Sequence, residues 1–289
     1  MTNTHQHATR TAAGRVWLIT GASSGFGLAL AEAALAAGDT VVAAVRRPEA
    51  LKDLADGHPD RVVPVALDVT DQARITAVVA EVLLWYGRID VLVNNAGRGL
   101  IGAVEENTDR ELRDLMDLHF FGPAALTRAV LPAMRRQRSG AVVQVSSMGG
   151  RFSFAGVGAY SATKFALEGL SEALALEVAP FGVKVMIVEP GSFRTGFAGG
   201  GALLESAAVD AYRETVGQVR ELLPQSDGKQ PGDPAKAAAA ILTALAAERT
   251  PLRLVLGNDA TDAILANADA ARAELLAWEP VSRGTDFDA

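Results

Sequence analysis

Short runs of β-branched residues alternate along the chain with longer segments rich in alanine and leucine. Seven of these runs are largely apolar, as is typical of strands that a parallel sheet buries on both faces. The segments between them have the length of helical crossovers. The pattern therefore predicts an α/β, doubly wound Rossmann fold, with a seven-stranded, mostly parallel sheet and helices on both faces. The expected strands are 16–20, 40–45, 62–67, 91–94, 141–146, 183–189 and 252–256, and the expected helices include 27–37, 72–85, 109–138, 159–179 and 234–248.

No internal repeat and no low-complexity linker divides the chain, so one domain is expected over residues 15–257. Residues 1–14 are polar and are expected to form a flexible N-terminal tail. Residues 191–232 contain three successive glycines and little periodic signal, which is typical of a mobile lid over a substrate. Residues 258–289 are expected to form an appended C-terminal helix and tail.

The 289-residue chain has no cysteine, which excludes disulfides, thiolate catalysis and cysteine-ligated clusters. Histidines such as His5, His7 and His58 lack further ligands at useful spacing, so no metal site is expected. The sequence shows no signal peptide and no apolar run of about 20 residues. These features favour a cytoplasmic protein without membrane contact.

The formal net charge is -7, from 27 basic and 34 acidic side chains. Such a chain repels a polyphosphate backbone, so no nucleic-acid partner is expected. The densest basic run, residues 135–138, is interpreted as the solvated end of a helix, where cations favour the negative end of the dipole.

A glycine-rich loop joins the first expected strand to the first expected helix. It reads Thr20-Gly21-Ala22-Ser23-Ser24-Gly25-Phe26-Gly27. At such a turn, missing side chains let the backbone approach a pyrophosphate, and the amides at the helix N-terminus supply positive potential. The spacing differs from the usual G-x-G-x-x-G, and a tight turn without a ligand is the alternative.

The end of the second expected strand carries a cation where dinucleotide folds that bind NAD commonly carry an acid. Arg46 stands 19 residues after Gly27 and is followed by Arg47. A guanidinium at this place pairs with a 2′-phosphate, which favours NADP(H) over NAD(H). Two exposed arginines at a strand end are the alternative.

Tyr160 and Lys164 are four residues apart in a segment of helix formers, so both side chains lie on one helix face. A tyrosine has an unperturbed pKa of about 10, and lowering it to about 7 takes about 4 kcal/mol. A nearby ammonium and a cationic nicotinamide supply that energy in principle, which makes Tyr160 a candidate proton donor and acceptor. Ser147 follows the fifth expected strand, at the sheet edge where ligands bind. Ordinary packing of the tyrosine and lysine is the alternative.

Several motifs in order resemble the short-chain dehydrogenase/reductase family over residues 15–257. They are the glycine loop 20–27, Asp68, Asn94-Asn95-Ala96-Gly97, Ser147, Tyr160-x-x-x-Lys164 and Pro190-Gly191. The resemblance implies hydride transfer between the nicotinamide C4 and a carbonyl or alcohol carbon. It implies that Tyr160 is the general acid or base, that Ser147 bonds the substrate oxygen, and that Lys164 lowers the pKa of the tyrosine and holds the ribose.

The same resemblance assigns positions around the cofactor. Asp68 and Val69 would meet the adenine, Asn95 to Gly97 would border the cofactor, and Phe193 and Thr195 would contact the carboxamide. With the glycine loop and Arg46, the expected cofactor-binding residues are Gly21, Ser23, Ser24, Gly25, Phe26, Gly27, Arg46, Asp68, Val69, Asn95, Ala96, Gly97, Tyr160, Lys164, Pro190, Gly191, Phe193 and Thr195.

His119 departs from the family pattern, which usually has an asparagine 25 residues after Asn94. In the family that asparagine is thought to distort the helix and hold a water that links the lysine to solvent. Imidazole also donates and accepts, so His119 joins Ser147, Tyr160 and Lys164 as a candidate catalytic residue. A histidine that only packs there remains the alternative.

The sequence thus predicts an NADPH-dependent carbonyl reductase acting on a small, hydrophobic carbonyl or alcohol. Its pocket walls are expected at 98–101, at 148–154 and in the lid, with Phe152, Phe154, Phe193 and Phe197 as apolar groups. A catalytically silent NADP(H) sensor on the same fold is the alternative. Family members often associate through the helices at 124–134 and 166–176, so a homo-oligomer, dimer or tetramer, is expected.

Overall fold

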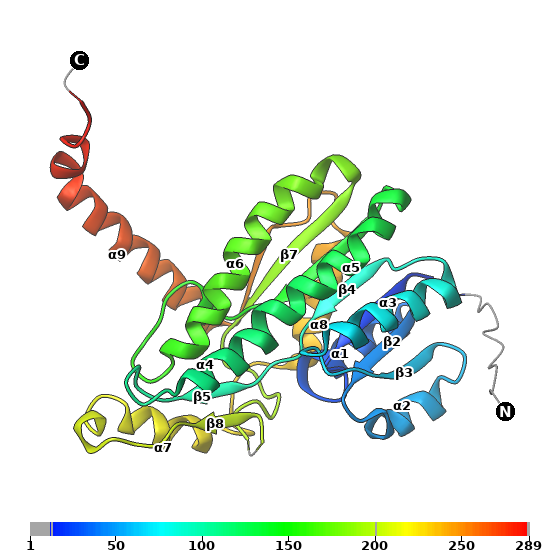
Figure 1. The fold of residues 1–289 in the computed structure, drawn as a ribbon, viewed down its shortest axis with the longest axis horizontal. Coiled ribbons are helices and arrows are strands. Elements are labelled where there is room, and N and C mark those ends of the chain that lie inside the picture. Colours follow the sequence, from blue (N-terminus) through cyan, green and yellow to red (C-terminus); the bar gives the residue numbers. More distant parts are fainter. Residues whose placement is uncertain (1–11, 13, 200, 288–289) are drawn as a thin grey trace.

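The computed structural model describes residues 12, 14–199 and 201–287, so most of the tail expected at 1–14 lies outside the described residues. Its seven-stranded sheet is parallel throughout and has the order β3-β2-β1-β4-β6-β7-β9. The doubly wound fold is therefore confirmed (Figure 1). The strands are β1 (Val16–Thr20), β2 (Thr40–Val45), β3 (Val62–Ala66), β4 (Val91–Asn94), β6 (Gly140–Val145), β7 (Val183–Pro190) and β9 (Arg253–Leu256).

Helices cover both faces of this sheet (Figure 1). α1 and α8 pack on one face, where Trp17 and Ile19 of β1 point, and α3, α5 and α6 pack on the other, where Val16 and Leu18 point. Because strand side chains alternate between faces, a strand covered on both sides is apolar at every position. The main helices are α1 (Gly25–Ala36), α2 (Lys52–Gly57), α3 (Gln72–Tyr86), α4 (Asp109–Met116), α5 (Gly122–Gln137), α6 (Gly158–Val178), α7 (Gly217–Gln225), α8 (Pro234–Ala246) and α9 (Asn258–Arg283).

The single helix expected at 109–138 is wrong, because the structure divides it into α4, a π-helical turn at Asp117–Phe121, and α5. Pro123 lies at the start of α5. Proline has no N–H, and its ring clashes with the carbonyl four residues earlier, which here belongs to His119. The wider turn accommodates both effects.

A second, two-stranded sheet pairs β5 (Gly99–Ile101) with β8 (Leu203–Glu205) in parallel. It joins the segment after β4 to residues 191–232, which also contain α7 (Figure 1). Neither strand was predicted, because three residues carry too little pattern and the pairing is long-range. The small sheet places the expected lid beside the carboxyl ends of the main strands.

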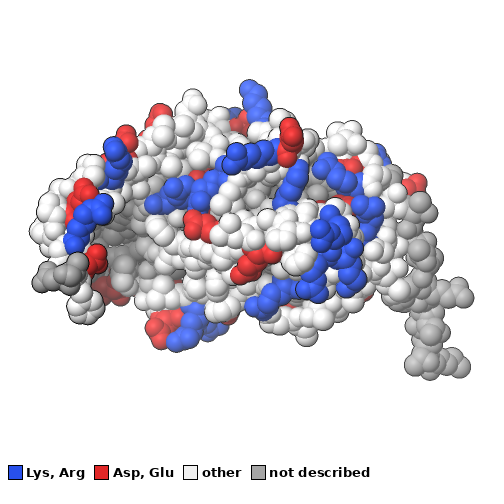
Figure 2. All heavy atoms as spheres, turned by 90° about the horizontal axis from the view of Figure 1, so that it is seen from above, with Lys and Arg blue, Asp and Glu red and all other residues white. Residues whose placement is uncertain are grey.

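Acidic and basic side chains are interspersed over the face that Figure 2 shows, although several Lys and Arg gather toward one side. Within the described residues, no helix is long and apolar enough to cross a membrane. No group of three or more potential metal ligands comes together there either.

Candidate active site

One large cavity, of about 660 Å³, opens where the strands of the main sheet end. Its floor is formed by residues that follow β1, β2, β4, β6 and β7, and its outer wall comes from residues 192–203 and from α7. In open α/β sheets, ligands bind at this carboxyl edge, where the strand order reverses. Here the reversal falls between β1 and β4, next to the glycine loop.

The glycine loop is shaped so that its backbone is accessible from the cavity. Gly21 and Gly25 have φ values of +65° and +53°, which favour glycine. A Cβ on Gly27 would lie 2.3 Å from the Gly21 carbonyl oxygen, so the loop closes on itself only because position 27 has no side chain. Ser24 caps α1 without a side-chain hydrogen bond, and α1 has no acidic residue in its first turn. These features fit a bound pyrophosphate.

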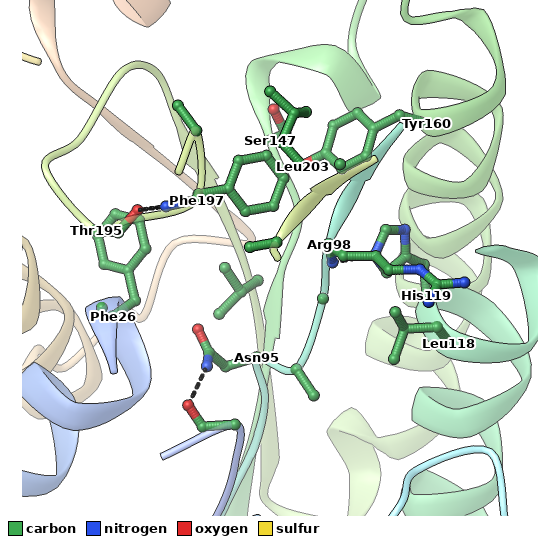
Figure 3. A pocket seen from close by; sticks show the side chains of 18 of the residues that line it. Phe26, Asn95, Arg98, Leu118, His119, Ser147, Tyr160, Thr195, Phe197 and Leu203 are labelled. Carbon is green, nitrogen blue, oxygen red and sulfur yellow. Dashed lines mark hydrogen bonds between the residues drawn. The ribbon is translucent and has the colours of Figure 1, made fainter. Parts of the chain in front are cut away.

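Asn95 fixes the loop from the neighbouring strand. Its Nδ2 donates to the carbonyl oxygens of Thr20 and Gly21 at 3.0 and 3.2 Å, and Figure 3 marks one of these bonds. In return, the Thr20 hydroxyl oxygen accepts from the backbone N–H groups of Asn95 and Ala96 at 2.9 and 3.1 Å. These bonds join β1 to β4. The sequence analysis included Thr20 in the glycine loop but assigned it no role; the signal was a hydroxyl residue at the end of an apolar strand.

Arg46 and Asp68 lie at one end of the cavity. Arg46 is exposed and lines the cavity, whereas Arg47 is exposed and does not. The Asp68 carboxylate accepts from the Thr70 N–H at 2.9 Å and from its hydroxyl at 2.8 Å. The Thr70 backbone bond is the main cause that lowers the pKa of Asp68, and Arg46 lowers it further. A fixed anion and a free cation thus stand side by side.

Ser147, Tyr160 and Lys164 converge at the other end of the cavity, as Figure 3 shows for the first two. The Ser147 hydroxyl oxygen accepts from the Gly149 N–H at 3.0 Å, in the turn after β6. Lys164 is buried, and its Nζ donates to the Val145 carbonyl oxygen at 2.9 Å and lies 5.6 Å from the centre of the Tyr160 ring. The predicted one-face arrangement of Tyr160 and Lys164 on α6 is confirmed.

The protein by itself does not lower the pKa of Tyr160 toward 7; the expectation also included a cationic nicotinamide, so it stays a prediction. Burial raises the pKa of Tyr160 to about 12, and only the hydrogen bond with Ser147 acts in the other direction. Burial also lowers the pKa of Lys164 to about 8, against the attraction of Glu168. In a poorly solvated site the charged form of each group is disfavoured. This desolvation effect exceeds the electrostatic attraction between a Tyr160 phenolate and the Lys164 ammonium.

The buried lysine predicts a stability that depends on pH. Its folded pKa of about 8 lies below the unfolded value of 10.5, so the cost of the buried charge is fully present below pH 8 and disappears as the pH rises to 10.5. Allowing for the lost bond to Val145, we expect Lys164→Met to raise the free energy of unfolding by about 2 kcal/mol at pH 7. By about pH 9.5 the native chain regains a similar amount of unfolding free energy, because most of the Lys164 side chains are then neutral in the folded state.

Urea titrations of both proteins at the two pH values measure this difference. The raised pKa of Tyr160 contributes stability that is lost as the pH rises from 10 toward 12, so the comparison ends before that window. If Lys164→Met raises the free energy of unfolding by the same amount at both pH values, the lowered pKa of Lys164 is contradicted.

His119 lies in the π-helical turn with both ring nitrogens engaged. Its Nε2 accepts from the Arg98 N–H at 3.1 Å, so Nδ1 carries the proton and donates to the Thr163 hydroxyl at 2.9 Å. That hydroxyl donates in turn to the Tyr160 carbonyl oxygen at 2.7 Å. Burial, followed by the charges of Lys164 and Arg98, lowers the pKa of His119 well below its usual value. A neutral imidazole therefore connects the segment after β4 to α6.

The wall opposite Tyr160 is apolar. Phe197 stands edge-on to the Tyr160 ring, with 5.9 Å between the ring centres, and points toward it beside Leu203 in Figure 3. Leu100, Phe154, Val157 and Leu223 also line the cavity. The pattern did not single out Leu203 or Leu223, which only the fold of residues 191–232 brings here.

Two of the expected aromatic wall residues have other environments. Phe152 does not line the cavity, and Phe193 packs against Phe26 with 5.0 Å between ring centres while touching the cavity edge. All the expected site residues line this cavity except Gly27, which lies behind the loop. They are Gly21, Ser23, Ser24, Gly25, Phe26, Arg46, Asp68, Val69, Asn95, Ala96, Gly97, His119, Ser147, Tyr160, Lys164, Pro190, Gly191, Phe193 and Thr195.

The structure is a doubly wound α/β sheet whose large cavity, at the carboxyl edge of the strands, has a polar cluster at one end. Residues 15–200 match the short chain dehydrogenase family. The chain belongs to this family, whose members are oxidoreductases that act on small-molecule substrates.

Two curated relatives align over most of their length. Oxidoreductase BOA17 from Botryotinia fuckeliana is 42% identical over 86% of this chain and 90% of its own. The 3-ketodihydrosphingosine reductase of Bacteroides thetaiotaomicron is 37% identical over 84% of this chain and 88% of its own.

Solved structures share the fold and include complexes with either cofactor. A short-chain dehydrogenase from Streptomyces avermitilis has a TM-score of 0.90 and 62% identity, covering 94% of this chain and 100% of its own. A Burkholderia phymatum protein with NAD has a TM-score of 0.79 and 25% identity over 92% and 95%. A Burkholderia cenocepacia protein with NADP has a TM-score of 0.71 and 27% identity over 91% and 97%. Relatives of this fold therefore bind NAD or NADP.

Proposed function

We propose that this chain is an NADPH-dependent carbonyl reductase for an apolar small molecule. The observation that carries the proposal is the convergence of Ser147, Tyr160 and Lys164 at the end of the cavity farthest from Arg46, with an apolar wall beside them. The glycine loop, Asp68 and residues 95–97 would hold the dinucleotide along the sheet edge between these two ends. When bound, the nicotinamide would supply or accept the hydride.

The chain's own residues would supply the proton and orient the substrate. The raised pKa keeps the Tyr160 hydroxyl protonated, so it is able to donate to a carbonyl oxygen. The Ser147 hydroxyl, fixed by the Gly149 N–H, would donate to the same oxygen and stabilise the charge that develops there. Lys164 would favour the phenolate that remains and would hold the ribose. Phe197 and Leu203 would exclude water.

His119 is better suited to positioning than to proton transfer. Both of its nitrogens are bonded to protein groups, and its pKa is low, so it neither gains nor passes a proton easily near neutral pH. Its contacts instead hold the start of α6, which carries Tyr160, against the segment after β4. We assign His119 the role of a positioning residue for α6.

A silent NADP(H) sensor explains the glycine loop but not the other end of the cavity. A lysine buried at a cost in stability, beside a partly buried tyrosine, is typical of a functional site. The two hypotheses are separated by mixing the protein and NADPH with aldehydes, ketones and quinones and following the loss of NADPH absorbance. Tight cofactor binding without turnover of any compound favours the sensor.

Arg46 should determine the choice of cofactor. It lines the cavity beside Asp68, whereas Arg47 is equally exposed but lies outside the cavity. Because an arginine pairs with a phosphate through charge-assisted hydrogen bonds, we expect Arg46→Ala to raise the KM for NADPH by about 10- to 100-fold and to leave that for NADH nearly unchanged. Arg47→Ala serves as the matched control with the native preference. Equal effects of Arg46→Ala on both cofactors would contradict this assignment.

The apolar wall supports a hydrophobic substrate. Phe197, Leu203 and Leu223 belong to residues 191–232, which we propose as the lid of the domain at residues 15–257. The reductase from Bacteroides thetaiotaomicron is named for 3-ketodihydrosphingosine, and by similarity a ketone with an extended aliphatic chain belongs in the substrate panel.

We also propose a cytoplasmic homo-oligomer, supported by the cysteine-free composition and by exposed apolar side chains on α6. Phe165 and Leu176 are 47% and 80% exposed within the chain. Apolar groups exposed on helices are typical of contacts between subunits.

A further inference from the structure

The C-terminal helix α9 extends away from the rest of the molecule (Figure 1). Its first turns contact β9 and the turn after β6, and Asp259 accepts from the Ser192 N–H at 2.7 Å. Ile264 is its last buried residue. From Leu265 to Phe287 every residue is exposed except the half-buried Glu279. About five turns of helix therefore lack packing against the described part of their own chain.

An apolar stripe runs along this projecting part. Ala268, Ala271, Leu275 and Trp278 continue the face of the buried Ile264, at intervals of four, three, four and three residues. Leu275 and Trp278 are 65% and 61% exposed. Helices in proteins owe most of their stability to packing of such a face rather than to intrinsic helix propensity. We therefore expect the stripe to pack against a partner.

We propose that α9 pairs with α9 of a second copy of this chain, in the antiparallel orientation. The contact is separate from the oxidoreductase site and from the exposed residues of α6. Leu275 of each copy lies opposite Trp278 of the partner subunit, and the intervals of three and four residues allow the side chains of the two helices to interdigitate. Because the pair is symmetric, one set of complementary residues serves both subunits.

Charged residues beside the stripe favour this orientation over the others. Arg272 and Glu279 flank the stripe on one side, and Glu274 flanks it on the other. With Leu275 opposite Trp278 of the partner subunit, Arg272 lies level with Glu279 of the partner subunit, and this ion pair occurs twice. A parallel pair instead sets Glu274 beside Glu279 of the partner subunit. An antiparallel pair shifted by seven residues sets Arg272 beside Arg272 of the partner subunit. Both arrangements place like charges together. Figure 2 shows basic and acidic side chains next to each other at the end of the molecule that carries α9.

Charge reversal tests the pairing in the full-length protein. Leu275→Glu identifies which association step depends on α9. We expect it to raise the dissociation constant of that step by about a hundredfold, measured by sedimentation velocity over a dilution series. Arg272→Glu and Glu279→Arg should each weaken this step by roughly tenfold, since each sets two like-charged pairs together across the contact. Glu279→Arg also removes the ion pair of Glu279 with Arg283 of the same helix. The double variant should restore the association to within about twofold.

Glu274→Arg is the matched control, because this side of the stripe faces no charge in the antiparallel pair, and we expect no change. A tighter association of Glu274→Arg would reveal a parallel pair and overturn the proposal. The proposal is also overturned if Leu275→Glu leaves the association intact. It is overturned as well if the double variant does not rescue the single reversals, because α9 then docks elsewhere on its partner. Far-UV circular dichroism and NADPH turnover check that the variants keep their fold.

Cysteine cross-linking tests the register directly, since the native chain has no cysteine. We expect oxidation of a mixture of Leu275→Cys and Trp278→Cys chains to yield mainly the mixed disulfide, because only level positions bring the Cα atoms within about 7 Å. Predominance of disulfides between identical chains contradicts the antiparallel pairing.

Discussion

Tyr160→Phe is expected to lower kcat for carbonyl reduction by roughly 10³-fold while the Kd for NADPH changes by less than about threefold. The substitution removes only the hydroxyl that would deliver the proton. The ring stays between His119 and Phe197, at 5.5 and 5.9 Å from their ring centres, so the shape of the cavity is kept. Steady-state kinetics with a reactive ketone, together with fluorescence titration of NADPH, separate the chemical step from binding.

Ser147→Ala provides the comparison. It removes a hydroxyl that would bond the same substrate oxygen, and a loss of about 10²-fold in kcat is expected. The hydrogen bond from that hydroxyl also lowers the pKa of Tyr160, so without it the pH at which reduction fails should move upward. If Tyr160→Phe retains most of the activity, then either another group donates the proton or the chemistry takes place elsewhere, and the mechanism proposed for this site is wrong.

Gly27→Ala is expected to raise the Kd for NADPH by more than about a hundredfold and to destabilise the protein by about 1–3 kcal/mol. The new Cβ would lie 2.3 Å from the Gly21 carbonyl oxygen and 2.6 Å from Asn95 Nδ2. Neither neighbour is the free end of a flexible side chain, so the backbone that faces the pyrophosphate must move. Isothermal titration with NADPH and urea unfolding measure the two effects.

Gly169 offers a matched control on α6. A Cβ there meets nothing within 4 Å, so Gly169→Ala should leave cofactor binding unchanged and stabilise the helix by up to about 1 kcal/mol. Tight NADPH binding by Gly27→Ala would mean that the loop tolerates a side chain, and the role assigned to its close approach would be contradicted.

The helix expected at 109–138 shows how a local signal is overlooked when periodicity is read alone. Apolar periodicity continues from α4 into α5, but Pro123 removes one hydrogen bond and displaces the carbonyl of His119. The proline was visible in the sequence, and its usual tolerance in the first turn of a helix concealed its effect on the turn before it. The resulting π-helical turn is what aims His119 at Arg98 and Thr163.

The pKa of Tyr160 illustrates a different limit. A spacing of four residues correctly placed Lys164 on the same face of α6, and from that ammonium together with a cationic nicotinamide a lowered tyrosine pKa follows. Desolvation acts in the opposite direction, and it depends on atoms from β6, the π-helical turn and residues 191–203 that no local pattern records. The size of this desolvation effect on the pKa is set only when these segments pack together.

The sequence by itself determined the seven strands of the main sheet and most of the helices between them, the glycine loop, and which end of the sheet carries Ser147, Tyr160 and Lys164. These features depend on periodicity and on residues near one another in the chain, which parallel strand topology converts into one sheet edge. Only the tertiary structure decided the apolar wall from β8 and α7, the fixed tautomer of His119 and the unpartnered face of α9. Each of these depends on contacts, or on missing contacts, between segments far apart in the sequence, and such contacts are set by packing of the whole chain.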